Sequence, residues 1–186
     1  MTFLKTKDLK ISTCLLKRKG WKMQLLPDMP DKCVICLAPH TSNWDFFWGL
    51  LFAKSTGLDA HFLMKKEWFF FPVGCIMKML GGIPVDRARK QSLTDAMTEM
   101  FAKNRKFCLA VAPEGTRQLV NEWKKGFYFI ATKAQVPILL AYIDYNKHEI
   151  GFGKMVTVSG DIDVDLPLIQ AFYHDKRGKF EERFHI

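Results

Sequence analysis

A histidine and an aspartate five positions apart are the residues of this sequence best suited to move a proton. They are His40 and Asp45, in the segment APHTSNWDFFWG at residues 38–49. In an extended chain the two side chains would lie about 16 Å apart, beyond contact. Residues 41–43 (TSN) all favour the start of a helix, and Ser42 followed by Asp45 matches a capping box with Asp in place of Glu. A helix that starts directly after His40 would bring Asp45 back towards it.

Such a pair predicts general-base catalysis. If the Asp45 carboxylate accepts the proton on Nδ1 of His40, Nε2 is left free as the base. The helix N-terminus adds hydrogen-bond donors for a developing negative charge. Spacing alone leaves one alternative open, namely a surface histidine followed by an aspartate that favours the helix dipole.

Two further polar clusters follow apolar runs and offer cations. Residues 112–117 (APEGTR) end in a turn rich in N–H groups and in Arg117, which can hold a phosphate through paired hydrogen bonds. Residues 81–87 (GGIPVDR) add Arg87. A surface arginine after a turn and an exposed Asp86–Arg87 ion pair are the plain alternatives.

The sequence contains four short apolar runs, and some of them end directly before the polar clusters described above. Because each run is continuously apolar, we expect strands that are covered on both faces of a sheet. The expected strands are residues 32–38, 83–85, 106–112 and 136–142. Helical spacing alternates with them, at residues 44–54, 67–80, 91–103 and 126–135.

This alternation predicts a single layered α/β domain with a largely parallel or mixed sheet flanked by helices. Ligands of such sheets bind beyond the carboxyl ends of the strands. We therefore expect His40, Arg87 and residues 114–117 to converge there. Residues 155–186 suggest a strand and then a helix around residues 166–173, with no evident chemistry.

The amino-acid composition limits the classes of binding partner that we expect. The 186 residues are 48% hydrophobic and 25% charged, which is typical of one folded domain. The 28 Lys and Arg exceed the 19 Asp and Glu, and the net charge of +9 indicates an anionic partner. Nucleic acid is not expected, because no zinc-finger, RNP or helix-turn-helix pattern occurs and the aromatic residues lie in apolar runs. Lipid headgroups and phosphorylated substrates remain.

Two further features bear on metals and on location. The five histidines show no ligand spacing, so no metal is expected. The five cysteines are an odd number and lie mostly in apolar runs, which favours a reducing cytoplasm. The stretch at residues 68–77 (WFFFPVGCIM) is too short to span a bilayer and contains Pro72 and Gly74. We expect it to be a buried helix or one that lies in a membrane interface.

Over residues 39–138 the chain resembles the glycerophosphate and lysophosphatidic acid acyltransferases, the HxxxxD acyltransferase family. Four sequence blocks of that family occur in order. They are His40 to Asp45; Lys65, Pro72, Gly74, Gly82 and Arg87; Pro113 to Arg117; and Val136 to Ile138. Agreement of four ordered blocks is far more specific than any one block.

The resemblance implies transfer of a fatty acyl group from an acyl-CoA or acyl carrier protein thioester to a hydroxyl of a lysophospholipid-type acceptor, a step of phospholipid biosynthesis. It makes His40 the general base and Asp45 the residue that orients it. The substrate-binding residues that it implies are Lys65, Arg87, Glu114, Gly115, Thr116 and Arg117, with the three cations on the acceptor's phosphate. No cofactor is implied, since the thioester is a substrate. The chain lacks a GxSxG serine elbow, which favours direct attack by the acceptor over an acyl-enzyme.

Two other functions stay open at this stage. A non-catalytic module that binds anionic lipid would use the charge but would not need His40 and Asp45, and an acyl thioesterase would activate water in place of the acceptor. We expect a basic N-terminal segment, residues 1–30, packed on the domain or the membrane, and an acyltransferase domain at residues 31–186. We expect a cytoplasmic protein that is peripheral on the inner face of the cell membrane. Residues 68–77 and the basic N-terminus would contact an anionic membrane surface.

Overall fold

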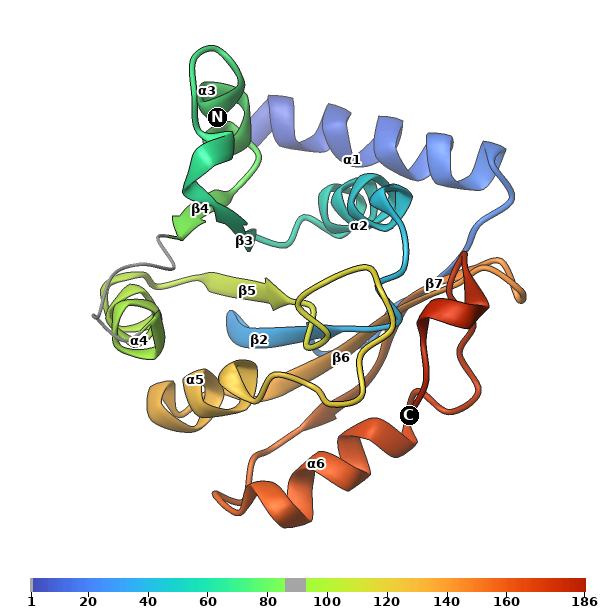
Figure 1. The fold of residues 1–186 in the computed structure, drawn as a ribbon. Helices are drawn as coiled ribbons and strands as arrows, with labels where there is room; N and C mark the ends of the chain where they lie inside the picture. Colours follow the sequence, from blue (N-terminus) through green and yellow to red (C-terminus); the bar gives the residue numbers. More distant parts are fainter. Residues whose placement is uncertain (1, 86–92) are drawn as a thin grey trace.

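The computed structural model describes residues 2–85 and 93–186, and within them the chain forms a seven-stranded sheet with helices on both faces (Figure 1). The strand order is β1-β7-β6-β2-β5-β3-β4. This confirms the predicted single α/β domain. The strands are β1 (Lys22–Gln24), β2 (Lys32–Leu37), β3 (Ala60–Lys65), β4 (Gly82–Val85), β5 (Phe107–Val111), β6 (Ile138–Asp144) and β7 (Glu149–Val156).

The sheet is mostly parallel. β2 lies between β5 and β6 and is parallel to both, and β3 continues the parallel run from β5 to β4. Only the β6–β7 pair is antiparallel among the described strands, while β1 runs parallel to β7 at the edge. The carboxyl ends of β2, β3, β4, β5 and β6 therefore meet at one edge of the sheet.

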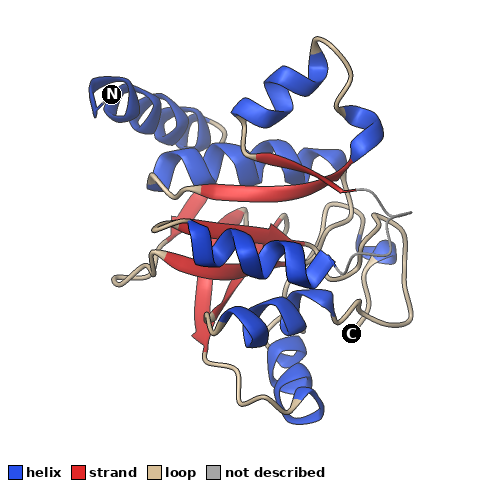
Figure 2. Cartoon of the chain, turned by 90° about the vertical axis from the view of Figure 1, so that its left-hand side faces the viewer, coloured by secondary structure: helices blue, strands red, loops and turns tan. Residues whose placement is uncertain are grey.

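Helices cover both sides of the sheet (Figures 1 and 2). One side carries α1 (Thr2–Arg18), α2 (Asn43–Thr56) and α3 (Val73–Met79). The other carries α4 (Leu93–Lys103), α5 (Gly126–Ala134) and α6 (Ile162–Ala171). Two single-turn 3-10 helices, η1 (Lys66–Trp68) and η2 (Glu181–Arg183), complete the described elements. None of the helices in residues 2–85 and 93–186 has the length and apolar character needed to cross a membrane.

The central strands are apolar on both faces because each face packs against a helical layer. Val34 and Leu140 belong to the hydrophobic cluster that contains side chains of α4, α5 and α6. Their neighbours Ile35 and Leu139 belong to the cluster on the opposite face, with side chains of α1 and α2. Since successive residues of a strand point to opposite faces, both sets must be apolar. The four predicted strands are present.

The predicted helix over residues 67–80 is wrong. η1 ends at Trp68, and α3 begins only at Val73, directly after Pro72. Proline lacks an amide hydrogen and its ring clashes with the preceding turn, so a proline disfavours a helix that runs through it, and Pro72 instead precedes the first residue of α3. The predicted helix around residues 166–173 starts earlier, at Ile162, where Asp161 accepts a hydrogen bond from the N–H of Asp163.

Candidate active site

The connection from β2 to α2 places His40 at the carboxyl edge of the sheet. α2 begins at Asn43 with Ser42 as its N-cap, and the Ser42 hydroxyl accepts a hydrogen bond from the N–H of Trp44 (3.2 Å). One oxygen of Asp45, Oδ2, accepts hydrogen bonds from the N–H groups of Thr41 and Ser42, at 2.8 Å each. This is the predicted capping box, and it turns the Asp45 carboxylate back towards the connection that carries His40.

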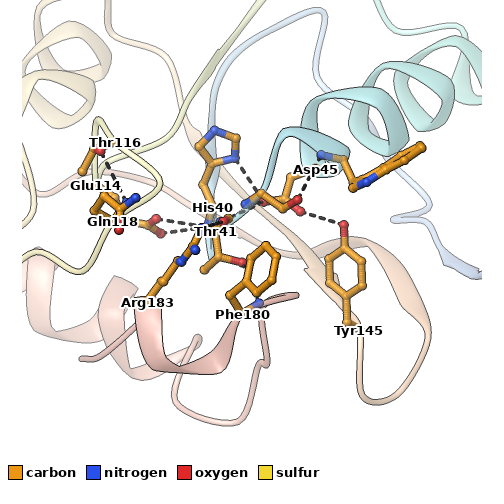
Figure 3. Close-up of polar contacts among 11 residues, drawn as sticks. His40, Thr41, Asp45, Glu114, Thr116, Gln118, Tyr145, Phe180 and Arg183 are labelled. Atoms are coloured by element: carbon orange, nitrogen blue, oxygen red, sulfur yellow. Dashed lines mark hydrogen bonds and ion pairs between the residues drawn. The ribbon is translucent and has the colours of Figure 1, made fainter.

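The imidazole of His40 contacts Asp45. Nδ1 of His40 lies 3.4 Å from Oδ2 of Asp45, and the two side chains are 16% and 1% exposed (Figure 3). Nδ1 is buried and has no hydrogen bond of good geometry within the described residues, and Oδ2 also accepts the two backbone hydrogen bonds. Catalytic hydrogen bonds of unliganded enzymes are often long and tighten when substrate binds. The ring is placed so that Nδ1–H can donate a hydrogen bond to Asp45 when the contact shortens.

A tyrosine that the sequence analysis missed holds the other oxygen of Asp45. Tyr145 directly follows β6 and donates a hydrogen bond from its hydroxyl to Oδ1 of Asp45 at 2.7 Å. Burial, together with the hydrogen bond to the Asp45 carboxylate, raises the pKa of Tyr145, so the phenol keeps its proton as a donor. Tyr145 could have been found from its position in the sequence, because it follows a buried strand at the edge of the sheet where His40 lies.

Glu114 supports His40 through the backbone. Both carboxyl oxygens of Glu114 lie 3.0 Å from the N–H of His40, and the residue is only 2% exposed. Burial raises the pKa of Glu114 to about 8; the hydrogen bond from His40 opposes this rise and the negative charge of Asp45 adds to it. At neutral pH the group therefore carries a proton in most molecules.

The turn after β5 presents Arg117 to solvent. Gly115 adopts a φ of 66°, which favours glycine, and a Cβ there would come within 2.8 Å of the Lys124 side chain. The turn is closed by hydrogen bonds from Gly115 N–H to the Ala112 carbonyl (3.1 Å) and from Lys124 N–H to the Pro113 carbonyl (2.8 Å). The predicted strand-end turn is thus present, with its arginine exposed.

A cavity of about 470 Å³ opens beside these elements. It is lined by residues 41–44 at the start of α2, residues 116–118 of the turn, and Lys179, Phe180 and Arg183 near the C-terminus. The last three come from a part of the sequence in which we expected no chemistry. Thr41, the residue after His40, lines the cavity, whereas His40 itself is not among its lining residues.

The structure brings most of the predicted site residues together. His40 contacts both Asp45 and Glu114, and Thr116 and Arg117 line the cavity. Lys65 is the last residue of β3, at the same edge of the sheet but two strands from β2, and it does not line the cavity. Arg87 lies outside the described residues.

Residues 22–144, more than half of the chain, match the model of a protein family described as Acyltransferase. The chain belongs to the acyltransferase family. The match contains β1 to β6 with His40, Asp45 and the turn that carries Arg117. Tyr145, Lys179 and Arg183 lie beyond the matched residues.

The fold resembles that of a solved acyltransferase, the 1-acyl-sn-glycerophosphate (LPA) acyltransferase PlsC from Thermotoga maritima. The TM-score is 0.62, and the likeness covers 92% of this chain and 77% of that one. The two sequences are 16% identical, so the likeness concerns the fold. A comparison with curated proteins gives no match.

Proposed function

We propose that this acyltransferase moves a fatty acyl group from the thioester of acyl-CoA or acyl carrier protein to a hydroxyl of a lysophospholipid-type acceptor. The observation that carries the proposal is the His40–Asp45 contact, fixed by Tyr145 and placed one residue from a cationic cavity. A base next to cations suits a nucleophile that carries a phosphate.

In the proposed mechanism Nε2 of His40 removes the proton of the acceptor hydroxyl as its oxygen attacks the thioester carbonyl. Asp45 holds the Nδ1 proton and stabilises the imidazolium that forms. Collapse of the tetrahedral intermediate breaks the carbon–sulfur bond, and the imidazolium returns the proton to the leaving thiolate. The products are an ester and a free thiol.

Product analysis tests this proposal against the two alternatives. Purified protein is incubated with a labelled acyl thioester, with and without lysophosphatidate, and the lipids are analysed by mass spectrometry. Acceptor-dependent formation of diacyl lipid supports acyl transfer. Release of free fatty acid at the same rate without acceptor would identify a thioesterase, and lipid binding without turnover of either donor would identify a binding module.

Arg117 is proposed to hold the acceptor's phosphate, together with Lys65 and Arg87. We predict that Arg117→Ala raises KM for the acceptor about ten- to a hundred-fold and leaves KM for the donor nearly unchanged, since a lost hydrogen bond to a charged group is worth about 1.5 to 3 kcal/mol. Separate steady-state titrations of the two substrates measure this. Arg105→Ala is the control, because Arg105 is exposed just before β5, at the opposite edge of the sheet. A change confined to the donor KM would assign Arg117 to the carrier's phosphates.

Membrane contact is proposed for the end of the molecule formed by η1, α3 and α1. Phe71 is 86% exposed, Trp68 and Phe70 are each 56% exposed, and Gly74 is the one buried residue of α3. These aromatic residues therefore do not fill the core. α1 lies on the same side of the sheet and exposes Ile11 and Leu15 beside basic residues (Figure 1). We propose that this surface rests on the inner face of the cell membrane, with residues 1–30 joining the domain to the lipid.

Flotation with vesicles tests the membrane proposal. We predict binding to anionic vesicles at low salt that weakens at high salt, because each basic residue near an anionic leaflet contributes about 1 kcal/mol. Phe71→Ser should weaken binding to anionic and neutral vesicles, whereas Leu168→Ser, a change of an exposed residue on α6 across the sheet, should not. Failure of the wild-type protein to float with anionic vesicles at low salt would contradict the proposal.

A further inference from the structure

The C-terminal segment, defined here as residues 177–183, is fixed against the residue that follows His40. Gly178 packs so closely on Thr41 that a Cβ at Gly178 would lie 2.7 Å from the Thr41 side chain. Two positions later the N–H of Phe180 donates a hydrogen bond to the Thr41 hydroxyl at 3.2 Å. The segment is therefore held in place by packing and hydrogen bonding, and it forms one wall of the cavity.

Two cations project from this wall. Lys179 lies between the two positions that contact Thr41, and its Nζ is 5.2 Å from the centre of the Trp44 ring. The guanidinium of Arg183 lies 4.3 Å from the centre of the Phe180 ring, and its Nη1 is 3.5 Å from the Thr41 carbonyl oxygen. Figure 3 shows Arg183 and Phe180 beside Thr41. These contacts orient both cations without neutralising them.

The cavity is short of negative charge. Among the described residues its lining contains Arg117, Lys179 and Arg183 and no carboxylate. Within the described part of the chain neither Arg117 nor Lys179 has an ion-pair partner, and Arg183 has only the exposed Glu182 at 3.7 Å. An exposed pair of that length contributes little. The N-terminus of α2 adds further positive potential to the same cavity.

We propose that Lys179 and Arg183, together with Arg117, bind a phosphate group of a substrate in this cavity. Two guanidinium groups and an ammonium group that line one cavity offer donors that suit the oxygens of a phosphate. The identity of the substrate rests on the proposed function, which supplies two sources of phosphate. One is the headgroup of the acceptor, and the other is the phosphorylated carrier of the donor. Lys179 and Arg183 are specificity-determining residues that lie outside the family match.

Direct binding without turnover tests the inference. A lysophosphatidate with a short acyl chain, kept below its micelle concentration, and coenzyme A serve as the phosphate-bearing probes. The matching monoacylglycerol and pantetheine serve as probes without phosphate. Isothermal titration calorimetry is carried out on the full chain and on Lys179→Gln, Arg183→Gln and Arg183→Lys. We expect each Gln variant to weaken one phosphate-bearing probe about ten- to a hundred-fold and to leave the uncharged probes unchanged.

The affected probe identifies the source of the phosphate, and Arg183→Lys should lose less affinity than Arg183→Gln. Lys179→Gln is the cleaner variant, since the ammonium group is exposed and makes no hydrogen bond to the backbone among the described residues. Lys154→Gln is the control, because Lys154 is an exposed residue of β7 that does not line the cavity.

Two results would overturn the inference. One is unchanged affinity of Lys179→Gln and Arg183→Gln for both phosphate-bearing probes. The other is an equal loss of affinity for these probes in Lys154→Gln, which would show that the effect depends on the overall charge of the protein and not on this cavity. Absence of acyl transfer by the wild-type protein, with phosphate binding intact and sensitive to Lys179, would instead refute the proposed function and keep the site.

Discussion

Replacing His40 with alanine is expected to lower kcat by about 10²- to 10⁴-fold while the protein stays folded, since a positioned general base contributes about that much. The fold should survive because the local contacts of His40 use its backbone. The N–H that Glu114 accepts is still present in alanine, and the capping box involves only Ser42 and Asp45. Acceptor-dependent turnover is measured beside circular dichroism of the same samples.

Asp45→Asn should cause a smaller loss of kcat than His40→Ala, because the amide oxygen can still accept backbone hydrogen bonds but no longer balances the imidazolium charge. His61→Ala is the matched control, since His61 lies in β3 and its ring packs on Phe107. If folded His40→Ala protein turned over substrate at nearly the wild-type rate, the proposed mechanism would be wrong. A comparable loss in His61→Ala would show that histidine removal acts through the fold.

A large dependence of stability on pH is expected from Glu114. Its pKa in the folded protein is about 8, raised by burial from an ordinary value of 4.5. The folded state then binds more protons than the unfolded state between these two values. The stabilisation is fully present below about pH 4.5 and is lost as the pH rises through 8. Ionising this buried carboxyl should lower the free energy of unfolding by on the order of 5 kcal/mol.

Urea denaturation at pH 5, 7 and 9 measures this effect. Glu114→Gln should flatten the fall in stability between pH 5 and pH 9, because the neutral amide does not titrate and can still accept the His40 N–H. Glu122→Gln is the control, since Glu122 is exposed in the loop before α5. If the free energy of unfolding depended on pH equally in the wild type and in Glu114→Gln, the Glu114 carboxyl would not be the cause of the pH dependence.

The sequence predicts those parts of the fold in which burial leaves a local pattern. β2, β5 and β6 are covered on both faces, so their continuous apolar runs are recognisable. The edge strand β1 has three residues, and β7 interrupts its apolar residues with two glycines and a lysine, so neither pattern is distinct. The helix predicted over residues 67–80 was based on an apolar stretch, and the prediction did not take into account the restriction that Pro72 places on the backbone.

The same distinction holds for the candidate site. His40 and Asp45 are close in sequence, and the helix start between them is encoded by Ser42 and its neighbours. Tyr145 meets Asp45 across 100 positions, and Phe180 meets Thr41 across 139. Contacts of that range are set by the packing of the whole sheet and leave no spacing to recognise. The cationic wall with Lys179 and Arg183 therefore became visible only in three dimensions.

The docking of the C-terminal segment on Thr41 has a consequence for the order of events during synthesis. The β2–α2 connection leaves the ribosome well before residues 177–183 are made, and contacts between such distant positions form late because of the entropy of closing the loop. A nascent chain that already contains His40, Asp45 and Arg117 still lacks one wall of its cavity. The proposed phosphate site is thus completed only after His40 and Asp45 have been made, when the chain has been extended through Arg183.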